Sequence, residues 1–287
     1  DVYKRQGFLV RYAYWSCVVL AVGTEVTAVA EYMKYWFPAV PGWQWVCVFS
    51  AALIFINAMS VKAFGTIEYW FSTIKITAIV AFIILGAYVV WGNPQYGTAL
   101  YTSHGGFFPN GVWGMWIAVV ISIFSYLSVE MIAVAAGEAE DPERAVKKAF
   151  RATIVRLVVF YLLTLALILA IVPWDEAGKG GSPFVKVMQA LDIPGAAGVI
   201  NFIVLVAALS AMNSQLYITT RMMFSLSRAG HAPSVLGRLT RSGTPLNALL
   251  LSTSGIAIAA VLNALYPETS FTLMMAISMF GALFTWM

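Results

Sequence analysis

Eight long apolar segments restrict the folds that this chain can adopt. Each approaches the length of about 20 residues that an α-helix needs to cross a hydrocarbon core about 30 Å thick. The segments are Phe8–Tyr32, Trp45–Val61, Trp70–Trp91, Gly114–Ala136, Ile154–Val172, Ala196–Tyr217, Ala248–Tyr266 and Phe271–Met287. Their apolar residues run continuously instead of alternating with polar ones, which argues against a transmembrane β-barrel. The sequence therefore predicts an all-α integral membrane protein, a bundle of about eight transmembrane helices.

Composition and the placement of aromatic residues agree with this prediction. The chain is 61% hydrophobic and 10% charged, whereas about 25% of the residues in a soluble domain are charged. Tryptophan and tyrosine cluster near the segment ends, as they do at membrane–water interfaces. These aromatic residues are Trp43, Trp45, Tyr69, Trp70, Trp91, Trp174 and Tyr266.

The basic residues are divided unequally between the two sides of the predicted membrane. Of the 17 Lys and Arg residues, all but three fall on the side of the N-terminal end and every second loop. The other side holds only Lys34, Lys179 and Lys186. Because cytoplasmic loops are enriched in Lys and Arg, the first side is predicted to be cytoplasmic, with both chain ends there. The net charge of +4 is interpreted as this orientation signal and not as a sign of nucleic-acid binding.

Two carboxylates, Glu130 and Glu25, lie inside apolar segments. An ionised carboxylate there costs about 2.5–3.5 kcal/mol on insertion scales, so it needs a partner, a proton or a water-filled cavity. Glu130 closely follows the hydroxyl side chains of Ser125, Tyr126 and Ser128 near the middle of the fourth segment. We therefore expect Glu130 to serve a solute or proton pathway. For Glu25, packing and a pathway role remain equally open.

Other polar residues near these segments have competing interpretations. Lys75 lies five residues into the third segment, where it either snorkels to the interface or places a cation inside the bundle. The run from Asn213 to Tyr217 closes the sixth segment, and its amides and hydroxyls either join helices or line a polar cavity. Glu31 and Glu68 fall near interfaces, and we expect both to be solvated helix ends.

Several chemistries find no support in the sequence. It contains no G-x-x-x-x-G-K-[ST] phosphate-binding loop and no G-x-S-x-G or H-E-x-x-H hydrolase motif. Cys17 and Cys47 are interpreted as small apolar packing residues, and His104 and His231 fall in loops on opposite sides of the membrane. We expect no enzymatic activity, no cofactor and no metal site.

Specific motifs in this chain resemble those of a known transporter family. They are Ala30-Glu-Tyr-Met-Lys-Tyr-Trp-Phe-Pro38, Gly105-Gly-Phe-Phe-Pro109, Phe124-Ser-Tyr-Leu-Ser-Val-Glu130, Gly137-Glu-Ala-Glu-Asp-Pro142, Ile171-Val-Pro-Trp174, Ser210-Ala-Met-Asn-Ser214 and Gly230-His-Ala-Pro233. Together they resemble the amino acid permeases of the amino acid–polyamine–organocation superfamily, in its bacterial branch. The resemblance covers residues 7–287, whereas residues 1–6 fit nothing in the family and are interpreted as a candidate non-native leader.

The resemblance implies the leucine-transporter-like fold, in which two inverted five-helix repeats enclose a site at the membrane midplane. The eight segments correspond to the third to tenth helices of that fold, so the first two and last two helices would be absent from this chain. Gly114–Ala136 would be the broken first helix of the second repeat, interrupted near Ser125–Val129. Members of the family usually have Gly where this chain has Ser128.

The resemblance also implies roles for individual residues. Phe124 resembles an aromatic gate over the substrate, Glu130 resembles the acid tied to proton coupling, and Lys75 resembles a lysine whose ammonium replaces sodium. Glu25 is added as a further candidate for proton coupling. The candidate substrate-binding residues are Phe124, Ser125, Tyr126, Ser128, Asn213, Ser214 and Tyr217.

From these residues we expect secondary active transport of an amino acid across the plasma (inner) membrane. The expected mode is import with protons by alternating access, and the expected partners are the amino acid, protons and the lipid bilayer. An amino acid or polyamine exchanger of the same fold and a non-transporting amino acid sensor remain as alternatives. The sequence leaves open which amino acid is carried and what the oligomeric state is.

Overall fold

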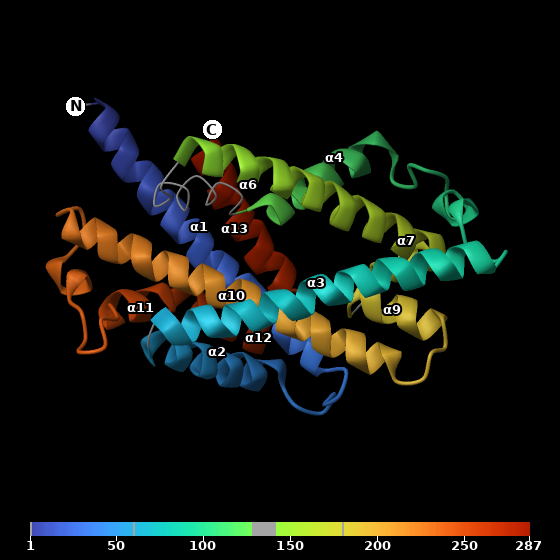
Figure 1. Cartoon of the computed structure of the whole chain (residues 1–287), viewed down its shortest axis with the longest axis horizontal. Helices are drawn as coiled ribbons and strands as arrows, with labels where there is room; N and C mark the ends of the chain where they lie inside the picture. The colour runs from blue at the N-terminus through green and yellow to red at the C-terminus, as the bar shows by residue number, and fades with distance from the viewer. Residues whose placement is uncertain (1, 60, 128–141, 180) are drawn as a thin grey trace. The chain divides into compact units, whose positions relative to one another are not determined.

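The computed structural model describes residues 2–59, 61–127, 142–179 and 181–287, and its regular structure within these ranges is helical, without β-strands (Figure 1). Six helical stretches there are long and apolar enough to cross a membrane. Two shorter apolar helices cover Gly111–Tyr126 and Ser270–Trp286. The predicted all-α membrane fold is confirmed, and the fourth and eighth predicted segments correspond to the two shorter helices.

Five of the predicted segments each match one helix. These are α1 (Val2–Met33), α2 (Gly42–Met59), α3 (Val61–Gly92), α10 (Ala196–Arg228) and α13 (Ser270–Trp286). Several of the predicted ends differ from the helix ends. Helices α1 and α3 begin earlier than predicted, at Val2 and Val61, and α10 continues about three turns beyond Tyr217 to Arg228. The polar residues that follow Tyr217 do not end the helix, since Thr219 and Thr220 donate hydrogen bonds to backbone carbonyls one turn earlier.

The other predicted segments are divided among several elements. The fourth overlaps α4 (Gly111–Ser122) and the 3-10 turn η2 (Ile123–Tyr126). The fifth overlaps the end of α6 (Pro142–Leu157) and includes the π-helical turn η3 (Val158–Leu162) and α7 (Leu163–Ile171). The seventh overlaps α11 (Leu246–Ser252) and includes α12 (Ser254–Leu265). Short helical elements fall between the segments, at η1 (Thr98–Tyr101), α8 (Trp174–Ala177), α9 (Pro183–Ala190) and η4 (Ser234–Gly237).

The chain divides into two compact units, residues 1–75 with 201–287 and residues 76–200. The core of the first unit forms around α1, which packs against α2, α12 and α13 (Figure 1). Fully buried side chains from α1, α10 and α13, among them Val22, Met212 and Met274, meet in this core. Because α1 is apolar around most of its circumference, it can be enclosed in this way.

Small residues allow the helices of the first unit to approach closely. A Cβ atom added to Gly255 on α12 would lie 1.9 Å from the carbonyl oxygen of Val19 on α1. Ser278 on α13 donates a hydrogen bond of 3.0 Å to the carbonyl of Cys17, which is fully buried. Cys17 is therefore a packing residue as predicted, but Cys47 is exposed on the outer face of α2, so its predicted packing role was wrong.

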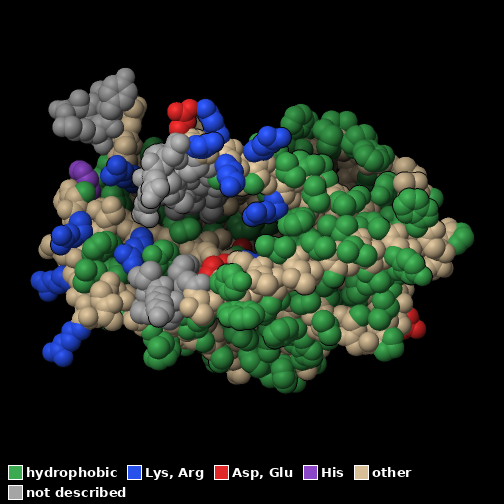
Figure 2. Space-filling model, viewed as in Figure 1, with side chains coloured by type: hydrophobic (Ala, Val, Ile, Leu, Met, Phe, Trp, Pro, Cys, Tyr) green, Lys and Arg blue, Asp and Glu red, His purple; other side chains and the backbone are tan. Residues whose placement is uncertain are grey.

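The second unit packs around α7. Tyr101 of η1 donates a hydrogen bond of 2.9 Å to the carbonyl of Ala166 on α7, and the rings of Phe82 and Phe184 lie 4.9 Å apart. Many other apolar side chains of this unit are exposed, such as Trp91 and Trp113. Hydrophobic side chains cover much of the visible surface (Figure 2). Such a surface suits a hydrocarbon environment better than water.

Candidate functional site

The fourth apolar segment loses α-helical geometry in the middle, without Gly or Pro. Helix α4 ends at Ser122, η2 follows, and Leu127 has an extended backbone with φ −59° and ψ 138°. The departure from α-helical geometry begins at Ile123, two residues before the predicted interruption at Ser125–Val129. Ser128 and Glu130, two of the predicted site residues, lie outside the described ranges.

A tyrosine of η3 supports the irregular turn. The hydroxyl of Tyr161 donates a hydrogen bond of 3.1 Å to the carbonyl of Ser125, and the ring of Tyr161 meets that of Tyr126 edge to face. An irregular backbone at membrane depth needs such partners because lipid offers none. Ser125 and Tyr126 are exposed, while Phe124 is half-buried. Three of the seven predicted substrate-binding residues, Phe124, Ser125 and Tyr126, thus lie on this turn.

A second polar site lies in the first unit, between α3 and α10. The ammonium of Lys75 donates a hydrogen bond of 2.7 Å to the Ser210 hydroxyl, and that hydroxyl donates one of 2.6 Å to Oε1 of Glu68. The Lys75 nitrogen is also 3.8 Å from Oε1 of Glu68. Lys75 and Glu68 are seven residues apart on one helix, which places both on the face toward Ser210.

Two asparagines extend this network to α2. Nδ2 of Asn213 donates a hydrogen bond of 3.4 Å to Oε2 of Glu68. Oδ1 of Asn213 accepts a hydrogen bond of 2.8 Å from Asn57, which donates another of 2.9 Å to the carbonyl of Leu53. Asn213 is fully buried and Asn57 nearly so. We call Glu68, Lys75, Ser210, Asn213 and Asn57 the Lys75 network.

The prediction for Glu68 was wrong. It was expected to be a solvated helix end, but its side chain is only 22% exposed and lies among Lys75, Ser210 and Asn213. The physical reason is the spacing of two helical turns from Lys75, which could have indicated the contact from the sequence. Glu31, the other glutamate of that prediction, pairs with Lys34 at 2.6 Å and is about one-third exposed, as expected for a helix end.

The remaining candidate residues of the first unit fall into two groups. Glu25 on α1 is partly buried and interacts electrostatically with Lys75. The Lys75 ammonium therefore interacts with two carboxylates, those of Glu68 and Glu25. Ser214 and Tyr217 on α10 are partly exposed, and the Arg221 guanidinium lies 5.2 Å from the centre of the Tyr217 ring. Of the candidate substrate-binding residues on α10, Asn213 is the one that belongs to the Lys75 network.

In the described part of the chain, no three His, Cys, Asp or Glu side chains lie close enough together to hold an ion. The Lys75 network contains an ammonium and a carboxylate joined by a hydroxyl. What such a group can do chemically is exchange protons over short hydrogen bonds.

Comparison with known proteins gives a consistent result. The amino acid permease family matches residues 2–287 of the chain. Over 285 residues the chain is 40% identical to the uncharacterized amino acid permease YtnA of Bacillus subtilis (strain 168). The aligned region covers 98% of this chain and 62% of that relative. It is 39% identical over 269 residues to the gamma-aminobutyric acid permease of the same organism. That alignment covers 92% of this chain and 57% of the relative.

A third relative is the aromatic amino acid transport protein AroP of Escherichia coli (strain K12), 36% identical over 283 residues, with 98% of this chain and 62% of the relative covered. The chain thus spans about three-fifths of the length of these relatives. All three are named as permeases or transport proteins and not as enzymes. The chain belongs to the amino acid permease family.

Proposed function

We propose that this chain forms the core of a plasma-membrane permease that imports an amino acid together with protons by alternating access. Family membership supports the amino acid as substrate, and the long apolar helices support a multi-pass membrane position. The unequal distribution of Lys and Arg supports cytoplasmic chain ends. The observation that carries the coupling to protons is the direct hydrogen-bonded connection from Lys75 through Ser210 to Glu68.

In this proposal the Lys75 network holds the transported proton. With both groups ionised, Lys75 carries the proton as an ammonium and Glu68 is a carboxylate. Ser210 can accept a proton from the ammonium while its own hydroxyl proton passes to Oε1 of Glu68. The products are a neutral amine and a neutral carboxylic acid, and Ser210 is unchanged. The Lys75–Glu68 pair has no net charge in either form, which suits a largely buried site.

Proton release then requires that the network become accessible to one side of the membrane. A neutral Lys75 can be reprotonated and a protonated Glu68 can lose its proton to water, so the pair returns to its ionised form. Glu25 interacts electrostatically with the same ammonium. The asparagine pair fixes Oε2 of Glu68, so Oε1 remains directed toward Ser210.

We assign substrate contact to the irregular turn at Phe124, Ser125 and Tyr126. Interrupted helices of transporters expose backbone groups that can bind the charged ends of a substrate. Two hydroxyl-bearing side chains are exposed at this turn, and the half-buried Phe124 supplies an aromatic surface. Asn213 was a candidate substrate ligand, and its burial within the Lys75 network supports a coupling role instead.

Uptake by the full-length protein in proteoliposomes tests this proposal. With the interior alkaline, we expect a radiolabelled amino acid to accumulate above its external concentration, and the accumulation to collapse when an ionophore removes the pH gradient. Uptake that depends only on amino acid preloaded inside the vesicles would contradict proton coupling and support an exchanger. Binding without any uptake would support a sensor and overturn transport itself.

A further inference from the structure

The π-helical turn η3 interrupts the helical stretch that runs from α6 into α7. A π turn holds one more residue than an α turn, so it shifts the direction of the side chains beyond it by about 100°. Thr164 stabilises this geometry, because its buried hydroxyl donates hydrogen bonds to the carbonyls of Phe160 and Tyr161. Such turns often occur at functional sites. Two features of η3 are candidates for that role, a hollow beside it and the side chain of Tyr161.

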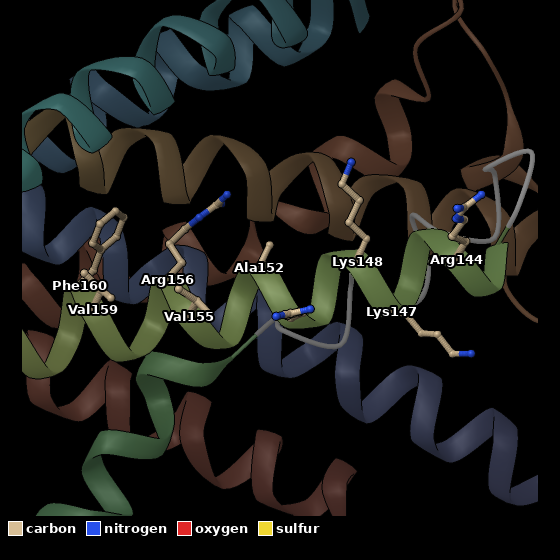
Figure 3. Close-up of a pocket in the computed structure, with 9 residues that line it drawn as sticks. Arg144, Lys147, Lys148, Ala152, Val155, Arg156, Val159 and Phe160 are labelled. Carbon is tan, nitrogen blue, oxygen red and sulfur yellow. The ribbon is translucent and has the colours of Figure 1, made fainter.

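The hollow runs along α6 and ends at Val159 and Phe160 of η3. Its lining residues all belong to this one helical stretch. The basic side chains of α6 diverge, since Lys148 and Arg156 project to one side and Lys147 to the other (Figure 3). The hollow therefore presents no converging set of groups to a ligand, and it does not account for the π turn.

Tyr161, in contrast, connects η3 to the interrupted segment at η2. Its hydroxyl donates the hydrogen bond of 3.1 Å to the carbonyl of Ser125. Its ring centre lies 6.1 Å from that of Tyr126, and the two rings are almost perpendicular, at 88°. One side chain thus contacts two consecutive residues of η2, once through the backbone and once through a side chain.

The local sequence does not by itself favour the interrupted form of this segment. Residues 115–127 contain no Gly or Pro, so an uninterrupted α-helix is open to them. None of the four residues of η2 is buried, so packing in a core does not fix the turn. Contacts from outside the segment must therefore favour the interrupted form, and those of Tyr161 are of this kind.

The population of the interrupted form sets the affinity of any ligand that binds to it. If a binding-competent form is only partly populated, the apparent dissociation constant rises in inverse proportion to its population. The loss of one neutral hydrogen bond changes such an equilibrium by about fivefold. A contact that does not touch the ligand can therefore control how tightly the ligand binds.

We propose that Tyr161 is a positioning residue for substrate binding, because its hydroxyl keeps η2 in the interrupted form before the substrate arrives. This inference rests on the proposed assignment of substrate contact to η2. A carbonyl oxygen can accept two hydrogen bonds, so the bond from Tyr161 does not prevent a donor of the substrate from binding to the Ser125 carbonyl. Tyr161 acts through Ser125 and Tyr126 and does not itself contact the substrate.

Uptake kinetics of the full-length protein in proteoliposomes test this proposal. The probe is the radiolabelled common amino acid that the wild type takes up fastest. In Tyr161→Phe we expect KM to rise by about fivefold and the maximal rate to stay unchanged, because saturating substrate restores the interrupted form. The matched control is Tyr101→Phe, which loses a hydrogen bond of 2.9 Å from a tyrosine hydroxyl to the Ala166 carbonyl in the same unit. Its KM should equal that of the wild type.

A second amino acid distinguishes positioning from direct contact. A positioning residue acts on the form of the protein, so KM should rise by the same factor for two substrates with side chains of different size. A rise for only one substrate would indicate direct contact with its side chain and would overturn the positioning role.

The remaining outcomes separate this inference from the proposed function. An unchanged KM in Tyr161→Phe, or an equal rise in Tyr101→Phe, would overturn the inference while transport by the wild type remained intact. A wild type that neither binds nor takes up any amino acid would instead overturn the proposed function, and this inference with it.

Discussion

The Lys75 network and the irregular turn at η2 accommodate polar groups in an apolar chain in opposite ways. In the network, side chains from α2, α3 and α10 satisfy one another, and the backbone remains helical. At η2 the backbone itself leaves the helix, and the described support is one hydrogen bond from Tyr161 to the Ser125 carbonyl together with a ring contact. The charged side chains of the network are about one-quarter exposed, whereas Ser125 and Tyr126 at η2 are exposed.

We propose that these two regions serve two tasks of a permease. A largely buried pair of opposite charges can hold a proton at a lower cost than an unpaired charge. An open turn with exposed polar groups can bind and release a solute. We therefore expect changes in the network to uncouple transport from protons, and changes at the turn to alter affinity or local stability.

Replacing Glu68 should have the largest effect on coupling. Glu68→Gln preserves the shape of the side chain but removes the proton acceptor and leaves Lys75 with less compensation. We expect accumulation driven by a pH gradient to fall by about a hundredfold, within the range that a positioned proton-transfer group contributes. Uptake into proteoliposomes measures this. Glu31→Gln is the control, because Glu31 forms its ion pair with Lys34 near a helix end; equal losses in both variants would remove Glu68 from the coupling mechanism.

Replacing Ser210 should have an intermediate effect. Ser210→Ala removes the hydroxyl between Lys75 and Glu68, but both charged groups remain and still attract each other across 3.8 Å. A hydrogen bond to a charged group contributes about 1.5–3 kcal/mol, so we expect the initial rate of gradient-driven uptake to fall by about tenfold. Thr73→Ala, at an exposed threonine of α3 whose hydroxyl bonds to the Tyr69 carbonyl of the same helix, should leave the rate unchanged. A normal rate in Ser210→Ala would show that the hydroxyl is not on the proton path.

Removing the support of the irregular turn should have the smallest effect. Tyr161→Phe deletes the hydrogen bond to the Ser125 carbonyl but keeps the ring contact with Tyr126. A neutral hydrogen bond contributes about 1 kcal/mol, which corresponds to a fall of about 2 °C in melting temperature. Differential scanning fluorimetry can detect this shift. Tyr88→Phe, at a highly exposed tyrosine of α3, should show none, and proton coupling should persist in both variants.

Much of the fold could be predicted from the sequence because apolar length alone determines where a helix can cross a membrane. The ends were less predictable: α10 continues to Arg228 because threonines satisfy their hydroxyls on the helix backbone and do not terminate it. The interruption after Ser122 has no Gly or Pro to signal it, and only the family resemblance indicated it. The hydrogen bond from Tyr161 to the Ser125 carbonyl supports the interruption, and a linear pattern does not contain such a tertiary contact.

The candidate site could likewise be predicted only in part from the sequence. Lys75 and Glu25 stood out because charges are rare in apolar segments, and Glu68 was missed because its position near an interface suggested solvation. The sequence could not indicate which residue lies between these charges. Ser210 has no distinguishing feature in the sequence, and only the structure places its hydroxyl between Lys75 and Glu68. The Asn57–Asn213 hydrogen bond likewise joins residues far apart in the chain.

The central claim is that the ionisable pair of Lys75 and Glu68 carries the proton, and its removal as a pair tests this most directly. Replacing one partner leaves a buried charge uncompensated, at a cost of about 3–5 kcal/mol, whereas replacing both with neutral groups is often tolerated. The measurement is pH-gradient-driven accumulation in proteoliposomes by the double variant Lys75→Met/Glu68→Gln, with exchange of internal for external amino acid recorded in the same vesicles. We predict that exchange persists while accumulation is lost. Accumulation at the wild-type level by the double variant would contradict the account.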